Sequence, residues 1–297
     1  MLKSIAIVTL VVRSIAPVED AYEEHLQYTV AERGEIGRSL ARTWNTPAMR
    51  GRDYVLMQPA SGAPVYLRLV EAAPGTPEVE PFRSSGWTAT ELLVTDPDAL
   101  AASFDEAPIR VIGPPRDLMP VANPPRAFQA LGPANEPFYF TRFLPGGSGL
   151  DLGRASTPVD RVFIAVVGGA DLDALRAFWG RSLGLPLTEF GAWQIGVVAR
   201  AWDLPPDTRF ALAGAALPKD FMIELDDYPD EVAPRPRPRG ALPGGWAMVT
   251  FTVERLDALE LPWQARPRRI NGRVYEGRRV ATATGPAGEI VELIETN

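Results

Sequence analysis

The stretch VDRVFIAVVGGADLDALRAFWGRSLGLPL, residues 159–187, predicts a strand, a loop and a helix in that order. Asp171 precedes the helical segment, where its carboxylate can accept hydrogen bonds from free N–H groups of the first turn. Apolar residues then recur at helical spacing: Leu172, Leu175, Phe178, Trp179 and Leu183. The strand RVFIAVV has the composition of a buried strand, except that Arg161 places a cation at its start. A charge in that position requires a partner or a function.

The composition describes a soluble globular chain with few options for catalysis. Its 297 residues exceed what one ordinary hydrophobic core requires, so we expect two domains. Hydrophobic residues make up 46% of the chain and charged residues 23%, as in soluble globular proteins. The chain has no cysteine and a single histidine, His25. This excludes disulfides, cysteine nucleophiles, cysteine-ligated zinc and any site that needs two imidazoles.

Charge and hydropathy indicate which partners the protein does not bind. The net charge of −7 is spread along the sequence, which argues against a nucleic-acid partner. The N-terminal segment MLKSIAIVTLVVRS superficially resembles a signal peptide, but Arg13 ends its apolar run, so a buried strand explains it better. No apolar run is long enough to cross a bilayer. We therefore expect a cytoplasmic protein without a membrane partner.

Four segments of the chain repeat one order of elements, in which an apolar strand precedes a helix and several further strands. The first strands are expected at Ser4–Val12, Thr88–Val94, Asp160–Val167 and Trp246–Val253. A helix is expected directly after each of them, at residues 18–28, 96–104, 171–183 and 255–263. This order predicts four units of the type βαβββ and hence an α+β fold.

Closing strands and breaker-rich connections complete the units. The closing strands are expected at Val65–Glu71, Ser148–Gly153, Phe221–Asp226 and Glu289–Glu295. The connections EAAPGTPEVEP, LPGGSG and APRPRPRGALPGG cannot continue a helix or a central strand. We therefore expect two domains of two units each, residues 1–154 and 155–297. The alternation of proline and arginine at Pro234–Arg239 is either a basic recognition motif or an extended linker, and we interpret it as a linker.

The repeated units, the LGLPL turn after the third helix and the ending GPAGEIVEL at residues 285–293 carry a resemblance to a known family. Together they resemble the vicinal oxygen chelate superfamily, which includes glyoxalase I, bleomycin-resistance proteins and extradiol dioxygenases. The resemblance implies an α+β fold in which four βαβββ units form two half-open barrel domains. It also implies a small-molecule ligand and allows a homodimer.

The resemblance further implies a divalent metal in the barrel, held by side chains near the start of each first strand and within each closing strand. These positions map to Arg161, Glu224, Met248 and Glu292 in the second domain, and to Ile7, Arg68, Ala89 and Asp151 in the first. The register of the fourth unit also admits Trp246 or Ala247. Arginine has no lone pair for a cation, and methionine is a weak ligand for a hard ion. We therefore expect no family-type metal centre and no cofactor.

The missing metal ligands suggest a reason for the charge on the third unit. The guanidinium of Arg161 can stand where the metal would be and satisfy Glu224 and Glu292 through forked hydrogen bonds. Two carboxylates in one cavity are otherwise costly to desolvate. We expect Arg161 within about 3–4 Å of at least one of these carboxylates. An inert ion cluster and a solvated arginine remain the alternatives.

Further side chains of the second domain are candidates for substrate binding because flat apolar ligands stack on aromatic and sulfur side chains. They are Trp179, Trp193, Trp246, Met248 and Tyr275. Aromatic residues on a helix face more often belong to the core, so packing is the alternative role.

Two classes of function follow from these residues. The first is a metal-independent isomerase or lyase in which Glu292 or Glu224 is the base and Arg161 the electrostatic clamp. Its substrate would be a small aromatic or carboxylate-bearing metabolite. The second is a non-catalytic binding protein of the bleomycin-resistance kind. The sequence contains no nucleophile-elbow motif and no phosphate-binding loop that would favour another class.

Overall fold

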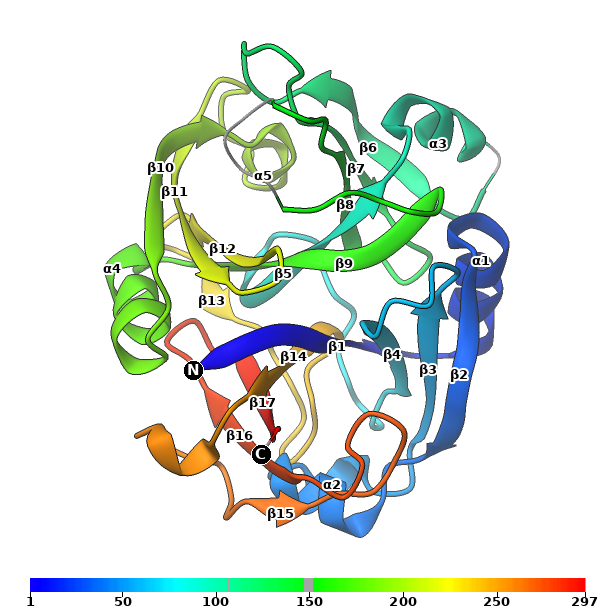
Figure 1. The fold of residues 1–297 in the computed structure, drawn as a ribbon, viewed down its shortest axis with the longest axis vertical. Helices are drawn as coiled ribbons and strands as arrows, with labels where there is room; N and C mark the ends of the chain where they lie inside the picture. Colours follow the sequence, from blue (N-terminus) through cyan, green and yellow to red (C-terminus); the bar gives the residue numbers. More distant parts are fainter. Residues whose placement is uncertain (106, 147–151, 297) are drawn as a thin grey trace.

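The protein folds into two curled, mixed β-sheets that lie next to each other (Figure 1). The computed structural model describes residues 1–105, 107–146 and 152–296. Each sheet forms a half-open barrel, and the helices are short and lie around the strands. The expected α+β fold of βαβββ units is confirmed. Within the described residues, no helix is both long and apolar enough to cross a membrane.

Sheet one combines the first and the fourth units. Its strand order is β15 (Arg268–Arg269), β16 (Arg279–Thr284), β17 (Ile290–Glu295), β14 (Gly245–Val253), β1 (Leu2–Val12), β4 (Tyr66–Glu71), β3 (Asp53–Pro59) and β2 (Tyr28–Glu35). The first strands of the two units, β1 and β14, pair antiparallel with Val8 opposite Val249. Each closing strand, β4 or β17, runs parallel to the first strand of its own unit.

Sheet two combines the second and the third units in the same way. Its strand order is β10 (Leu187–Gln194), β11 (Arg209–Leu217), β12 (Phe221–Asp227), β9 (Val159–Gly169), β5 (Ser84–Val94), β8 (Pro137–Arg142), β7 (Arg126–Leu131) and β6 (Arg110–Asp117). The first strands β5 and β9 pair antiparallel with Thr90 opposite Ala165. A short strand, β13 (Ala233–Pro234), pairs with the start of β5.

The expected division into residues 1–154 and 155–297 does not match the two sheets and is wrong. The chain passes from sheet one to sheet two after β4 and returns after β13, whereas the connection expected as the boundary joins β8 to β9 within sheet two. Proline and glycine show where a strand ends but not which sheet the next strand joins. Pairing is decided instead by the long apolar first strands, each of which covers the open edge of another.

The closing strands β4, β12 and β17 lie where the sequence predicts them. The closing strand of the second unit lies elsewhere. The closing strand of the described residues is β8, and the expected strand at Ser148–Gly153 falls largely on residues 148–151, outside the described ranges. Phe138 and Phe140 of β8 are fully buried, and their rings pack against each other in the core with centroids 5.5 Å apart. Burial of these two rings gives β8 its place in the sheet.

The helices agree with the expected order, except in the fourth unit. The described helices are α1 (Ala16–Leu26), α2 (Arg38–Thr43), α3 (Pro97–Ser103), α4 (Leu172–Arg176) and α5 (Gly196–Ala201), and α4 continues as a π-turn over Ala177–Ser182. Asp171 caps α4 as expected, because it accepts a 2.8 Å hydrogen bond from the N–H of Ala174. The fourth unit has only a 3₁₀ turn, Leu256–Ala258, and another 3₁₀ turn, Pro47–Met49, follows α2.

Three apolar clusters hold the fold together, and their positions define where a ligand can bind. One core lies between the sheets, where Trp179 packs against Trp87 of sheet two and Phe251 of sheet one, with ring centroids 5.7 Å apart in both pairs. The other two clusters fill the interiors of sheet one and sheet two. The interiors are where the barrel-type fold places polar side chains, so they are the candidate sites.

Candidate functional site

The interior of sheet two contains a cavity of about 150 Å³. Its walls are mainly apolar and include Phe143, Ile164, Phe190, Trp193, Leu212 and Met222. The polar side chains that line it are Glu91, Arg116, Gln129, Tyr139, Gln194 and Glu224. A mainly apolar pocket with a few convergent polar groups is the usual form of a small-molecule site. This cavity is therefore the candidate functional site.

Two carboxyl groups enter the cavity from the strands on either side of β9. Glu91 lies on β5, level with Ile164 of β9 and Tyr139 of β8. Glu224 lies on β12, level with Val166 of β9. The hydroxyl group of Thr141 donates a hydrogen bond to Glu91. The strand register thus brings two acidic side chains into one apolar space.

Burial changes the protonation of these groups. Burial raises the pKa of Glu91 to about 8, and the nearby carboxyl of Glu224 adds to this, while the hydrogen bond from Thr141 acts in the opposite direction. Burial also raises the pKa of Glu224 well above its ordinary value, with a further contribution from Asp226. The pKa of the fully buried Asp226 is itself raised to about 7. Around neutral pH the floor of the cavity therefore holds exchangeable protons.

Tyr139 adds a further polar group to this floor. Its hydroxyl oxygen is buried and has no hydrogen-bond partner within the described residues. Burial raises its pKa well above the ordinary value, and Tyr228, Asp226 and Glu224 contribute in the same direction. A neutral phenol without a partner can donate a hydrogen bond to a bound molecule.

The expected contact of Arg161 with the glutamates is absent from the described structure. Arg161 lies near the start of β9, three residues before Ile164, which pairs with Met222 of β12. Its guanidinium carbon is 4.3 Å from the ring centroid of Phe221. Its amino groups lie 3.4 Å from the backbone oxygen of Asp220. Parallel pairing of β9 with β12 places Glu224 too far along the sheet for contact. The hypothesis that Arg161 is the partner of Glu224 and Glu292 is wrong.

The other candidate residues are divided among three places. Trp193 lines the cavity of sheet two, and its indole N–H donates a 2.7 Å hydrogen bond to the backbone oxygen of Phe190. Trp179 and Trp246 lie in the core between the sheets and are 0% and 2% exposed, so their expected role as ligand contacts is corrected to packing. Met248 and Tyr275 are buried in the interior of sheet one. Only Trp193 remains available to a ligand in this cavity.

The interior of sheet one holds a buried ion pair in place of a cavity. The guanidinium of Arg68 on β4 lies 3.5 Å from the carboxylate of Glu292 on β17, and the two side chains are 2% and 0% exposed. Glu292 accepts hydrogen bonds from the hydroxyl of Thr250 at 2.7 Å and from the indole N–H of Trp44 at 2.5 Å. The hydroxyl of Tyr275 donates to the same carboxylate at 2.9 Å. Both carboxylate oxygens of Glu292 therefore have hydrogen-bond donors.

Arg68 is satisfied from several sides as well. It donates hydrogen bonds to Thr9 at 2.8 Å and to Tyr275 at 2.6 Å, and its guanidinium carbon lies 4.7 Å from the ring centroid of Trp44. Burial alone would lower the pKa of Arg68, but Tyr275 and Glu292 outweigh it, so the pKa is raised. The idea that an arginine replaces the metal charge thus describes Arg68, which pairs with Glu292 because the first unit joins the fourth.

Sequence reasoning mapped Arg68 correctly to a closing strand but did not pair it with Glu292. Asp151, which was mapped together with Arg68 to the first domain, lies outside the described residues. Glu91 was missed, although TATELLV shows the same signal as Arg161, a charge within an otherwise buried strand. Tyr139 was missed because the second closing strand was placed too late in the chain.

The side chains in neither interior fit the metal centre that the resemblance implies. In sheet one the central place is taken by a cation, Arg68, and Glu292 is fully engaged by hydrogen bonds. In sheet two, the positions next to Glu91 and Glu224 on β9 are Ile164 and Val166, which have no ligand atoms. Across the described residues, no group of three or more histidine, cysteine, aspartate or glutamate side chains is arranged to hold a metal ion.

Metal analysis checks this interpretation. We expect purified protein to contain less than one equivalent of transition metal and EDTA to leave its melting temperature unchanged, because two glutamates with raised pKa values form a poor ligand set. The measurements are elemental analysis and thermal unfolding with and without EDTA. One tightly bound iron, manganese, zinc or nickel ion per chain would contradict the argument.

Comparison with known proteins gives the fold a name. No family model and no curated protein sequence matches the chain. Among solved structures, glyoxalase I from Zea mays is similar at 13% identity with a TM-score of 0.65, and the match covers 98% of this chain and 92% of that one. A putative dioxygenase from Bacillus subtilis is similar at 11% identity with a TM-score of 0.61, over 99% of this chain and 85% of that one. At these identities the likeness concerns architecture, and this chain has the vicinal oxygen chelate fold in a form with four βαβββ units.

Proposed function

We propose that the cavity of sheet two binds a small, mainly apolar, uncharged molecule and that Glu91 and Glu224 exchange protons with it. The observation that carries the proposal is a pair of carboxyl groups with raised pKa values, the buried Glu91 and the half-buried Glu224, in an otherwise apolar cavity. Pairs of titratable groups in such surroundings are typical of acid–base sites, because their pKa values lie near the working pH. The reaction class is proton transfer next to a carbonyl group, as in an isomerase.

The two carboxyl groups suit different roles. Glu224, whose pKa is raised well above its ordinary value, can donate its proton to a carbonyl oxygen of the ligand. Glu91 has a pKa of about 8, so its carboxylate form, which the hydrogen bond from Thr141 favours, increases as the pH rises towards 8. In that form Glu91 can accept a proton from the neighbouring carbon. Glu91 gains the carbon-bound proton while Glu224 gives its proton to the carbonyl oxygen, so the ligand becomes an enol. Return of both protons restores the ketone with its hydrogen exchanged. In a ligand with a conjugated double bond, return of the proton to the far carbon of the dienol gives an isomer.

The same groups indicate which ligands are disfavoured. A carboxylate-bearing ligand would meet Glu91 and Glu224, and the lining arginine, Arg116, is exposed and donates to the backbone oxygen of Gln194. Burying an anion beside two acidic groups is costly. The aromatic wall of Phe190 and Trp193 favours a flat ring. A neutral aryl ketone therefore represents the proposed ligand class.

Binding of three aromatic probes tests the ligand class. We expect acetophenone to quench tryptophan fluorescence at lower concentration than benzoate by at least about tenfold, with benzylamine between them, because the cavity holds acids and few cations. The variant Trp193→Phe should lose most of the signal. Tighter binding of benzoate than of acetophenone would contradict the proposal.

Turnover is tested separately by exchange of the methyl protons of acetophenone in D₂O, followed by NMR. We expect the protein to accelerate exchange, and Glu91→Gln and Glu224→Gln to lower the rate by about 10²-fold, which is the usual contribution of one general acid or base. Glu289→Gln is the matched control, since Glu289 is also buried with a pKa raised to about 8 but does not line this cavity. If acetophenone binds but its protons do not exchange, the proposed proton transfer is refuted. The protein would then be a binding protein without turnover, a function that the aromatic wall of the cavity also supports.

A further inference from the structure

The alternating segment PRPRPR at residues 234–239 has two kinds of arginine. Arg235 is half-buried and donates hydrogen bonds to the backbone oxygens of Trp87 in β5 and Trp246 in β14, both at 2.7 Å, and to the hydroxyl of Ser84 at 3.0 Å. This arginine therefore fastens the segment to both sheets. Arg237 and Arg239 are exposed and have neither an ion pair nor a hydrogen-bond partner within the described residues.

The backbone that carries the two exposed arginines is fixed at both ends. Before them, β13 pairs with β5 and Arg235 holds the segment as described. After them, the backbone oxygen of Gly240 accepts a 2.8 Å hydrogen bond from the N–H of Ala48, and Ala241 and Leu242 are buried. The segment joins β13 to β14 with mostly exposed side chains, as a linker does, but its backbone is held in place. A fixed backbone places two guanidinium groups at one spot and lowers the entropy lost when they bind a ligand.

Arg237 and Arg239 line a second cavity, of about 280 Å³, together with Trp44, Asn45, Gln264 and Thr284. No carboxylate is among the residues that line it. The side-chain amide of Gln264 donates a 2.8 Å hydrogen bond to the hydroxyl oxygen of Thr284, which leaves the hydroxyl hydrogen free to donate. Hydrogen-bond donors thus prevail in this cavity, and the buried Trp44 forms part of its wall.

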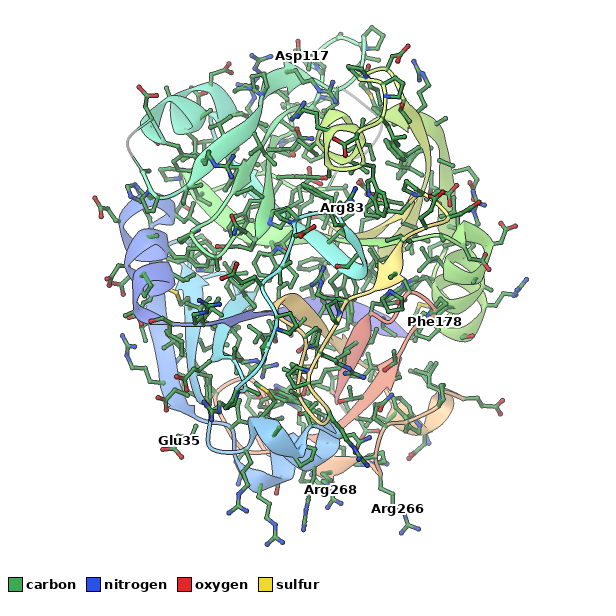
Figure 2. All side chains as sticks on the ribbon, turned by 180° about the vertical axis from the view of Figure 1, so that it is seen from behind. Glu35, Arg83, Asp117, Phe178, Arg266 and Arg268 are labelled. Carbon is green, nitrogen blue, oxygen red and sulfur yellow. The ribbon has the colours of Figure 1, made fainter. Side chains whose placement is uncertain are left out.

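The surroundings of the cavity add positive charge to a chain whose net charge is −7. Figure 2 shows Arg266 and Arg268 extending outward at the end of the molecule where α2 lies. Both side chains are exposed, and neither forms an ion pair within the described part of the chain. A local excess of arginine attracts anions and raises their concentration at the cavity mouth.

We propose that this second cavity is an anion site that takes a phosphate group, held by the guanidinium groups of Arg237 and Arg239. Planar guanidinium groups match phosphate oxygens in a forked, bidentate geometry. The hydroxyl of Thr284 and the amide of Asn45 complete the set of donors. The site is separate from the cavity of sheet two and does not depend on the function proposed for it.

Calorimetric titration of the full chain at low ionic strength tests the site, with inorganic phosphate and phenyl phosphate as probes and chloride as the reference. We expect both phosphates to bind at millimolar concentration or below and chloride to give no saturable signal. Tighter binding of phenyl phosphate would identify an aromatic phosphate ester as the ligand, whereas equal binding would identify free phosphate. Either result supports the anion site, and absence of saturable binding by both probes overturns it.

Two matched double variants decide whether the cavity or the general charge of this end binds the anion. The double change Arg237→Ala with Arg239→Ala should weaken binding by at least about tenfold, because both forked contacts are lost. The control Arg266→Ala with Arg268→Ala removes the same charge outside the cavity and should change the affinity by less than about threefold, as expected for screened exposed charges. All four side chains are exposed, so both variants should fold. Equal losses in the two variants would overturn the proposal.

Discussion

Replacing Arg68 with methionine is expected to lower the free energy of unfolding by about 3–5 kcal/mol, the usual cost of removing one partner of a buried ion pair. The change strands the carboxylate of Glu292, which is 0% exposed, in an interior without another cation among the described residues. It also removes the hydrogen bonds that Arg68 donates to Thr9 and Tyr275. Urea unfolding at constant pH measures the change, with the slope of the transition checked for constancy.

Two further variants show whether the stranded charge is the cause. Adding Glu292→Gln to Arg68→Met should recover part of the loss, because the unpaired charge is then gone. Arg161→Met is the matched control, since Arg161 is a half-buried arginine whose guanidinium lies over the ring of Phe221. Its loss should cost about 1 kcal/mol or less, as for cation–π contacts at exposed sites. An Arg68→Met protein as stable as its parent would refute the buried pair as a stabilising element.

The second large effect concerns pH. Burial raises the pKa of Glu91 from 4.5 to about 8 in the folded protein, so the folded state holds a proton in this range that the unfolded chain has released. The contribution of Glu91 to stability therefore falls as the pH rises from about 4.5 to about 8 and is lowest above that range. At about 1.4 kcal/mol for each pH unit, the contribution of Glu91 is about 5 kcal/mol. Glu91→Gln should remove this part of the decline, because glutamine does not ionise and can still accept the hydrogen bond from Thr141.

Free energies of unfolding measured across this pH range for parent and variant provide the test. Glu136→Gln is a useful comparison, because burial raises the pKa of Glu136 to about 7, so its effect should end about one pH unit earlier. The difference between Glu91→Gln and its parent should grow with pH up to about 8 and then stay constant. Parallel pH profiles of Glu91→Gln and its parent would show that Glu91 is already ionised in the fold at neutral pH.

Much of the fold could be predicted from the sequence because its signals are local. Apolar runs such as SIAIVTLVV and WAMVTFTV give strands in the expected places. Asp171 caps α4, the helix that follows β9, as expected. The periodicity of each unit is contained in about 80 residues, and hydrophobic pattern, caps and breakers act over shorter distances still. The residue types also led us to expect that an arginine lies beside Glu292.

Only the tertiary structure decided which arginine does so and where the open cavity lies. Pairing of β1 with β14 and of β5 with β9 is a choice among four similar apolar strands, and local sequence does not distinguish them. That choice joins Arg68 to Glu292 across 224 positions of the chain and leaves Arg161 beside Phe221. It also brings Glu91 and Glu224 into one cavity. The physical reason is that the free energy of pairing long strands depends on which faces and edges become buried together, a property of the assembled sheets.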